Sequence, residues 1–544
     1  DMQKISPLKR IQSLIKDHHQ EIRSIYLFSI LGGIVNLSLP LGVQTIIGLV
    51  MGATMVTSIY VLIFLVVLGV FLMGLFQINQ MKIIESIQQK VFAHYAFEFA
   101  DKIPQLDLKQ MDKYHIPEKV NRFFDSLNIQ KGFAKLLLDI PVATVQIVFG
   151  IVLLSLYHPL FIILGVILLV LLGLILYYTS QKGIETSIEE SNYKYEVAGF
   201  FGEIARTIKT FKFSQGSDLN LKRTDASVIG YLTARTTHFR VLLFQYKSLL
   251  FFKIALTTLM LTLGSYLLIN QQLNVGEFVA AEIVIMLVIG AVEKLITSLD
   301  SAYDVITGLE KLASVTDSPL DSSGDLELQT REGVEIEVKN FSFEFEAGKP
   351  VLDSLNLHIN AGDKIQLTGP AGSGKSIFMR ILTGNYPDFK GTLLINKVPI
   401  KNYSLDSLRK HTGILLQAQE IFNGTVWENI SLGNKEVNPS VILETAENLG
   451  FADFLNHFPQ GFDTEIEPLG KKTPQTIIKK ILLLRALCGD KRLLLLENPW
   501  NGLDTQLADN LRDYLLKKSN ATVLISTNES TGFDKKLVFD HGKV

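Results

Sequence analysis

The segment Gly369–Ser376 reads Gly-Pro-Ala-Gly-Ser-Gly-Lys-Ser and fits the pattern of a phosphate-binding loop. In such a loop successive backbone N–H groups and the N-terminus of the next helix surround a phosphate. Those donors would come from Gly372, Ser373, Gly374 and Lys375. The Lys375 ammonium would reach the β- and γ-phosphates, and the Ser376 hydroxyl would ligate Mg²⁺. The sequence therefore predicts a nucleoside triphosphate site that begins at Gly369.

The residues around this loop have the pattern needed to position it. A short strand is predicted over Lys364–Thr368, directly before the loop, and a helix over Ser376–Leu382, which Gly384 could terminate. Further strands are predicted over Val334–Val338 and Phe341–Phe345. The order strand, glycine-rich loop, helix indicates an α/β P-loop domain.

Composition indicates a second, different domain. The chain has 544 residues, 47% of them apolar and 19% charged, which is too long for one domain and too apolar for an ordinary soluble enzyme. The net charge of −2 gives no support for a nucleic-acid partner, because a binder of the phosphate backbone normally has a basic excess. The single cysteine, Cys488, lies in an apolar run and is predicted to be a buried, inert thiol.

Six apolar stretches have nearly the length of about 20 residues that a membrane span requires. They run over Ile25–Val50, Ile59–Gln77, Ile140–Leu156, Leu160–Tyr178, Leu249–Ile269 and Phe278–Thr297. We therefore expect an all-α transmembrane domain of six helices over residues 1–315. A linker rich in Asp, Ser, Pro and Gly is predicted over 316–331, followed by the nucleotide-binding domain over 332–544.

The basic residues predict the orientation of these spans. The short connections carry almost none, whereas the long ones after the second and fourth spans are rich in lysine and arginine. The positive-inside rule then places both termini and the nucleotide-binding domain in the cytoplasm, although solvated helix faces would also account for the basic residues. The long connections keep a helical period and are expected to turn back near Leu106–Pro117 and Thr207–Ser217. These turns would contact a cytoplasmic domain or be ordinary solvated loops.

Two ionisable residues, Glu293 and Lys294, lie toward the predicted cytoplasmic end of the last span. An ionisable group that faces lipid is costly, so these groups are expected to face a cavity or a partner helix. Snorkelling, pairing across helices and substrate contact account for them equally well.

With these features the chain resembles the ATP-binding cassette (ABC) exporters, in which a six-helix membrane domain precedes one nucleotide-binding domain. The resemblance covers essentially the whole chain and implies ATP and Mg²⁺ as cofactors. It implies that Phe345 stacks on adenine, and that Gln417 in Ile414-Leu-Leu-Gln417 meets the metal together with Ser376. Asn501-Gly-Leu-Asp504 resembles the loop that the family places beside the nucleotide.

The family pattern breaks at the signature. In the family, the signature Leu-Ser-Gly-Gly-Gln of one cassette closes over the nucleotide of the other. Here the corresponding residues are Thr473, Pro474, Gln475, Thr476 and Ile477. Without the two glycines the backbone cannot approach a γ-phosphate as closely, and Pro474 has no N–H to offer. The loop before it also differs, with Pro468 where the family usually has an acid.

It breaks again at the strand Leu493–Leu496, where the resemblance places Glu497 at the Mg²⁺ ligand and Asn498 at the catalytic base. An amide can hydrogen-bond a water but cannot take its proton. Loss of a positioned base typically lowers the rate by about 10²- to 10⁴-fold. Asn528, after the strand Thr522–Ile525, replaces the switch histidine. Any one replacement could be drift, but together they predict weak or absent ATP hydrolysis and no intact catalytic residue.

The resemblance implies an exporter subunit of the bacterial inner membrane that pairs with a second ABC subunit, as a homodimer or a heterodimer. Leu39-Pro-Leu-Gly-Val-Gln44 is similar to exporters of type I secretion systems, which suggests a polypeptide-like cargo and a periplasmic adaptor, although no peptidase domain precedes it. Two alternatives stay open. The chain could be a non-transporting scaffold or regulator that senses nucleotide, or a lipid flippase subunit in contact with membrane lipids.

Overall fold

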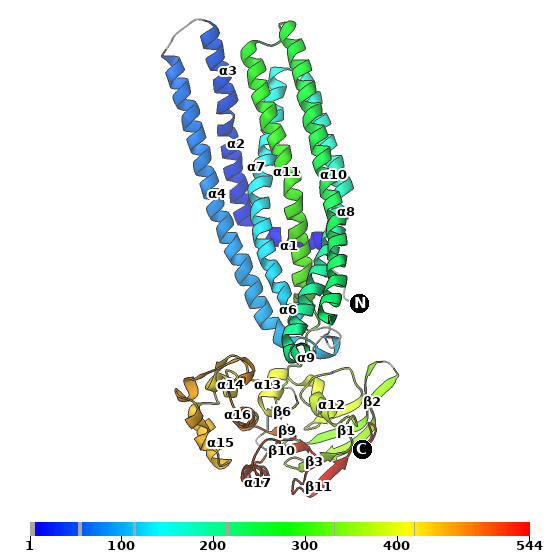
Figure 1. Ribbon diagram of the computed structural model, residues 1–544. Helices are drawn as coiled ribbons and strands as arrows, with labels where there is room; N and C mark the ends of the chain where they lie inside the picture. The colour runs from blue at the N-terminus through cyan, green and yellow to red at the C-terminus, as the bar shows by residue number, and fades with distance from the viewer. Residues whose placement is uncertain are drawn as a thin grey trace. The chain divides into compact units, whose positions relative to one another are not determined.

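The structure, a computed structural model, describes residues 6–52, 57–111, 116–213, 218–330, 332–346, 348–417 and 419–544. The chain divides into two compact units: Asp1–Gln105 with Lys113–Ser318, and Leu106–Asp112 with Pro319–Val544. The first unit is helical, and the second combines β-sheets with helices (Figure 1). This confirms the predicted fold class, a six-helix membrane domain plus an α/β P-loop domain.

The first unit is a set of long helices with short connecting helices. Its main elements are α1 (Pro7–Asp17), α2 (His19–Asn36), α3 (Ser38–Met51), α4 (Ser58–Lys102), α6 (Ile116–Asn121), α7 (Asp125–Tyr157), α8 (Leu160–Arg206), α9 (Ile208–Phe213), α10 (Leu219–Ile269) and α11 (Val275–Thr316). Among the described residues, six segments are long and apolar enough to cross a membrane, as predicted. The four helices α4, α8, α10 and α11 run for 42 to 51 residues, about twice the length that a membrane span requires.

The first predicted span is interrupted. α2 ends at Asn36 and α3 begins at Ser38, because Pro40 has no N–H to donate to the carbonyl of Asn36. Just before the break α2 lies very close to α7. A β-carbon at Gly33 would be 2.3 Å from a methyl group of Val145, so glycine is needed where the two helices meet.

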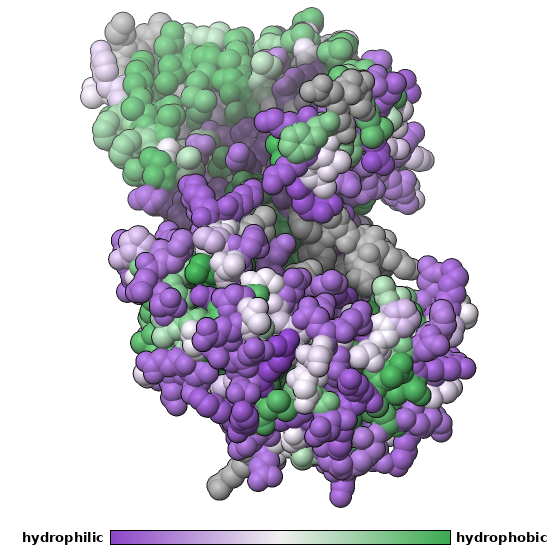
Figure 2. Space-filling model, turned by 60° about the horizontal axis from the view of Figure 1, so that its bottom comes forward, coloured by the Kyte–Doolittle hydropathy of each residue, from purple (hydrophilic) through white to green (hydrophobic). Residues whose placement is uncertain are grey.

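Helices α7 and α11 lie side by side along most of their length (Figure 1). A β-carbon at Gly132 of α7 would be 2.7 Å from Val305 and 3.0 Å from the carbonyl oxygen of Ser301, both on α11. Close backbone approach through small residues is the usual way in which membrane helices associate. Figure 2 shows apolar side chains over one part of the visible face of the helical unit and hydrophilic side chains over another.

The second unit contains two main sheets. The five-stranded sheet is parallel, in the order β11-β3-β10-β9-β6, and the four-stranded sheet is antiparallel, in the order β2-β1-β4-β5. The parallel strands are β3 (Lys364–Thr368), β6 (Thr412–Leu415), β9 (Leu493–Glu497), β10 (Thr522–Ser526) and β11 (Lys535–Val538). The antiparallel strands are β1 (Ile336–Glu346), β2 (Lys349–Ile359), β4 (Lys390–Ile395) and β5 (Val398–Pro399). A short pair, β7 (Gly424–Thr425) and β8 (Glu465–Ile466), completes the sheets of the described chain.

The helices of this unit are α12 (Lys375–Ile381), α13 (Leu405–Lys410), α14 (Val426–Ser431), α15 (Pro439–Asn448), α16 (Gln475–Leu487) and α17 (Thr505–Asp513). Cys488, directly after α16, is 1% exposed, and burial raises the pKa of its thiol to about 11. Both facts agree with the predicted inert thiol, because the reactive thiolate is then scarce at neutral pH.

Two local expectations differ from the structure. The strands predicted over Val334–Val338 and Phe341–Phe345 are one strand, β1, whose register shifts around Asn340, a residue with a φ of 45°. Of the predicted linker 316–331, helix α11 includes Thr316, and the chain from Pro319 onward belongs to the second unit.

The predicted turn near Leu106–Pro117 divides between the units. Its first part belongs to the second unit, where the Asp107 N–H donates to the carbonyl of Pro319 (2.9 Å). The Lys109 ammonium lies 5.3 Å from the centre of the Phe343 ring. Residues 112–115 and 214–217, within the two predicted turns, lie outside the described residues.

We expect Gly132→Ala to destabilise the helical unit by about 1–3 kcal/mol, the usual cost of an overpacked contact, because its methyl group would meet the backbone of α11. Gly173→Ala, on α8, is the matched control, since a β-carbon there meets nothing within 4 Å. The measurement is thermal unfolding of the two purified variants in detergent. Equal melting temperatures for both variants and the parent would contradict this account of the α7–α11 contact.

Candidate functional site

The phosphate-binding loop joins β3 to α12 at the carboxyl edge of the parallel sheet. β3 lies between β10 and β11, and its buried Ile365 and Leu367 anchor the start of the loop. Gly369, Gly372 and Gly374 have φ values of 137°, 79° and 98°, which favour glycine. A β-carbon at Gly369 would also be 2.0 Å from the carbonyl oxygen of Phe539. The loop conformation therefore depends on glycine, as the motif predicts.

A cavity of about 340 Å³ opens above this loop. It is lined by Val351, Ala371, Gly372, Ser373, Gly374, Lys375, Ser376, Ile377, Gln417, Glu497, Asn498 and Ser526. Parallel pairing brings these segments together, because Glu497 at the end of β9 lies opposite Ser526 at the end of β10. Helix α12 begins at Lys375, one residue earlier than predicted. Because Lys375 also lines the cavity, the N-terminus of the helix lies at the cavity.

The Lys375 ammonium is folded back onto its own loop. It donates to the carbonyls of Gly369 and Pro370 (both 2.8 Å) and to Ser373 Oγ (3.0 Å). Burial lowers the pKa of this ammonium, and the nearby Glu497 carboxylate opposes that shift. A phosphate oxygen is a stronger acceptor than a neutral carbonyl, so an incoming polyphosphate would compete well for Lys375.

The Glu497 carboxylate is 7% exposed and only partly satisfied. Its Oε2 accepts the backbone N–H of Gln417 (2.6 Å), whereas Oε1 is buried and has no hydrogen-bond partner among the described residues. An orphaned buried carboxylate oxygen is costly, and a cation would satisfy it. Oxygen donors are the ligands that Mg²⁺ prefers, so Glu497 with the Ser376 hydroxyl fits that ion. The predicted role of the Gln417 side chain stays a prediction, since here the contact is through its backbone.

Asn498 lines the cavity beside Glu497 and presents an exposed amide. Its φ of 41° is left-handed, a conformation that asparagine tolerates better than most residues. Its N–H donates to Ser526 O (2.9 Å), and its carbonyl accepts from Lys479 Nζ (3.1 Å). The backbone at this position is therefore held from β10 and from α16, while the side chain stays free to reach a water in the cavity.

Several predicted site residues lie elsewhere among the described residues. Phe345 is 39% exposed and packs edge-on against Phe343 and Tyr386, with ring centres 5.0 and 5.4 Å away, and it does not line the cavity. The Asp504 carboxylate caps α17 by accepting the N–H of Leu507 (2.9 Å). Asn528 is exposed beyond the end of β10 and does not line the cavity either. Their nucleotide roles remain predictions.

The segment in place of the signature begins α16. Pro474 is the residue before the helix, with a ψ of 139°, and no side chain caps this end. The N–H groups of Ile477 and Ile478 donate to the Pro474 carbonyl, and that of Thr473 donates to Gly470 O (2.9 Å). Gln475 and Thr476, predicted to replace the two signature glycines, have exposed side chains, and that replacement stays a prediction.

Some contributors to the site were not predicted from sequence. Val351, Ala371, Ile377 and Ser526 line the cavity, and Lys479 holds the backbone of Asn498. Ser526 could have been found, because it ends a strand that pairs in parallel with β9. Lys479 had no such signal, since its contact joins residues far apart in the chain.

Comparison with known proteins identifies the class of this chain. Residues 24–292 match the family model of the ABC transporter transmembrane region, and residues 352–501 match that of the ABC transporter. A solved structure of a bacterial Atm1-family ABC exporter with ATP bound superposes with a TM-score of 0.86 at 19% identity, covering 97% of this chain and 94% of that one. The chain therefore belongs to the ABC transporters, with a transmembrane region and an ABC domain on one polypeptide, and it has the fold of that exporter.

The curated relatives match only about half of this chain. The ATP-dependent lipid A-core flippase of Syntrophus aciditrophicus (strain SB) is 29% identical over 52% of this chain and 48% of its own length. The mitochondrial iron-sulfur clusters transporter ATM1 of Chaetomium globosum is 28% identical over 52% of this chain and 48% of its own length. The chain thus spans about half the length of the curated relatives it matches.

We expect Glu497→Gln to weaken Mg²⁺ binding at the nucleotide site, because an amide supplies no negative charge to the metal. The apparent Mg²⁺ affinity, titrated with a fluorescent ATP analogue bound, should fall by about tenfold or more. Glu420→Gln, an exposed acid outside the cavity, is the control. A Mg²⁺ titration unchanged by Glu497→Gln would show that this carboxylate does not hold the metal.

Proposed function

We propose that this chain is an exporter subunit that binds ATP and Mg²⁺ at the Gly369–Ser376 loop and hydrolyses ATP slowly or not at all. One observation carries the proposal. Glu497 is the sole carboxylate among the described residues that line the cavity, and the residue beside it, where the family has its base, is Asn498. The site therefore offers oxygen ligands for Mg²⁺ and hydrogen-bond donors for phosphate, but it has no second carboxylate among the described residues that line it.

Glu497 is poorly placed to substitute for the missing base. Its Oε2 already accepts the Gln417 N–H, and its free Oε1 is the oxygen that suits the metal. A carboxylate engaged with Mg²⁺ holds its electron pair on the ion and accepts a proton from water poorly. Asn498 can orient a water through its amide but cannot deprotonate it.

The signature change affects the other side of the nucleotide. In the family, two cassettes enclose two nucleotides, so each chain contributes a loop to one site and a signature to the other. A homodimer of this chain would lack base and signature in both sites. A heterodimer with an intact partner would lack the base in one site and the signature in the other. We therefore propose a low-turnover half of a heterodimer, or a homodimer within a larger export assembly.

The proposed location is the bacterial inner membrane, with both termini and the nucleotide-binding domain in the cytoplasm. The lysine- and arginine-rich long connections support this orientation. For cargo, the residues Leu39–Gln44 favour a polypeptide exported with a periplasmic adaptor. The name of the Syntrophus relative favours lipid instead, so a lipid flippase subunit is the second candidate.

We expect the purified wild-type protein to hydrolyse ATP at least about 10²-fold more slowly than an ABC exporter with an intact base and signature assayed alongside it. The measurement is steady-state phosphate release in nanodiscs at saturating Mg²⁺-ATP. Turnover equal to that of the intact exporter would refute the role assigned to Asn498. Copurification of a second cassette protein with an intact signature would support the heterodimer.

Lys375→Ala separates a nucleotide-binding subunit from a scaffold with a vestigial cassette. Because the variant removes the cation that reaches the β- and γ-phosphates, we expect ATP affinity to fall by about tenfold or more, measured by equilibrium binding of a fluorescent ATP analogue. Lys536→Ala, an exposed lysine on β11, is the matched control. Unchanged affinity in Lys375→Ala would favour the scaffold.

A further inference from the structure

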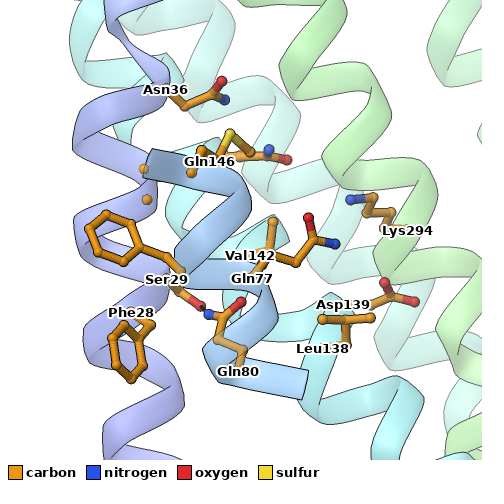
Figure 3. Close-up of a pocket in the computed structure, with 14 residues that line it drawn as sticks. Phe28, Ser29, Asn36, Gln77, Gln80, Leu138, Asp139, Val142, Gln146 and Lys294 are labelled. Carbon is orange, nitrogen blue, oxygen red and sulfur yellow. Dashed lines mark hydrogen bonds between the residues drawn. The ribbon is translucent and has the colours of Figure 1, made fainter. Parts of the chain in front are cut away.

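A pocket of about 100 Å³ lies in the helical unit between α2, α4 and α7, and Lys294 of α11 reaches its edge (Figure 3). Seven of its fourteen lining residues have polar or charged side chains, a high share for a space between membrane helices. The nucleotide chemistry proposed above makes no use of this pocket. Its polar groups therefore need a separate explanation.

Part of this polarity has a structural role. The Gln80 amide donates to Ser29 Oγ (2.6 Å) and to the carbonyl of Ile25 (3.0 Å), which joins α4 to α2. One oxygen of Asp139, Oδ2, accepts the hydroxyl of Ser298 (3.2 Å), which joins α7 to α11. These bonds account for the Gln80 amide nitrogen and for one oxygen of Asp139.

Other groups remain open. Within the described residues, the amides of Asn36, Gln77 and Gln146 and the ammonium of Lys294 make no hydrogen bond or ion pair. The second oxygen of Asp139 is free too, and no ion pair joins Asp139 to Lys294. Figure 3 shows the ends of Gln77, Gln146 and Lys294 pointing into the same space. One positive group, one negative group and three amides thus face a common pocket.

The neighbouring charges behave differently. Glu293, adjacent to Lys294 in α11, pairs with Lys253 of α10 at 2.6 Å. That pair neutralises itself across two helices, as charges inside membrane proteins usually do. Of the explanations considered for Glu293 and Lys294, pairing across helices accounts for Glu293. Lys294 instead faces the pocket and Asp139, and it forms no ion pair among the described residues.

The distance of these two charges from the ends of their helices indicates which part of a lipid bilayer lies beside them. Lys294 lies 19 residues from the start of α11 at Val275, and Asp139 lies 18 residues from the end of α7 at Tyr157. At 1.5 Å per residue both stand about 27–29 Å from the short connections at that end of the helices. The hydrocarbon core of a bilayer is about 30 Å thick, so both charges lie level with the head groups of one leaflet.

The rest of the pocket lining is apolar. Phe28 and Phe76 contribute aromatic rings, and Met73 and Val142 contribute aliphatic surface. A molecule bound here would have its polar end at the charges and its apolar end against these side chains.

We propose that this pocket binds the head group of a phospholipid that carries a phosphate and a primary ammonium, with the phosphate at Lys294 and the ammonium at Asp139. A purely anionic head group would satisfy Lys294 but place a second negative charge beside Asp139. A choline head group balances both charges but has no N–H to donate to Asp139. The open amides would donate to phosphate and ester oxygens. This site is independent of nucleotide binding and turnover.

The test uses the purified full-length chain in detergent and short-chain phosphatidylethanolamine, phosphatidylglycerol and phosphatidylcholine of matched chains, with binding measured by native mass spectrometry. We expect phosphatidylethanolamine to bind about tenfold more tightly than phosphatidylcholine, the size typical of one hydrogen bond to a charged group. Asp139→Asn should abolish that preference, and Lys294→Gln should weaken binding of all three lipids. Lys247→Gln, an exposed lysine on α10 outside the pocket, should bind like wild type.

Retention of the wild-type ethanolamine preference in Asp139→Asn would overturn the proposal, and so would unchanged binding of all three lipids in Lys294→Gln. Equal binding of free phosphoethanolamine and of the lipid would overturn the lipid as the source of the head group, since the apolar wall would then contribute nothing. If Asp139→Asn does not fold, Gln146→Leu tests the same pocket from α7. Its removal of one amide should weaken binding of every phosphate head group, and unchanged binding would again refute the site.

Discussion

Parallel pairing of β3 and β9 with β10 is the constraint on which the nucleotide site depends. The pairing aligns Leu367 with Ser526 and Ser526 with Glu497, so the phosphate loop and the carboxylate emerge at one edge of the sheet. Both faces of these strands are covered, which is why they read as nearly continuous apolar runs. A slip of one residue would turn Glu497 into the apolar core and leave Lys375 without a carboxylate across the cavity.

The helical unit follows a different rule, since many of its exposed side chains are apolar and several of its polar groups pair between helices. Gln80 and Ser29 join α2 to α4, and Lys253 with Glu293 joins α10 to α11. Each pair satisfies groups that lipid could not satisfy. Unlike these paired groups, Lys294 and Asp139 form no ion pair, and we propose that a lipid head group binds to both.

Sequence patterns predicted much of this, most reliably where chemistry and local structure coincide. The glycines of the phosphate loop need left-handed backbone, so their spacing alone located the loop and the strand before it. Apolar length alone predicted the six spans. The break at Pro40 and the merging of two predicted strands into β1 were missed, because both depend on how neighbouring elements continue across a local irregularity.

By itself the sequence determined which chemical groups exist: a lysine and a hydroxyl for phosphate and metal, one acid at Glu497, and an amide at Asn498. Only the tertiary structure decided which of them meet. It brought Glu497, Asn498 and Ser526 to one cavity, left Phe345 and Asn528 outside it, and set Lys294 and Asp139 at one pocket. The reason is physical: local propensity acts over a few residues, whereas these meetings depend on strand register and helix packing between segments distant in the chain.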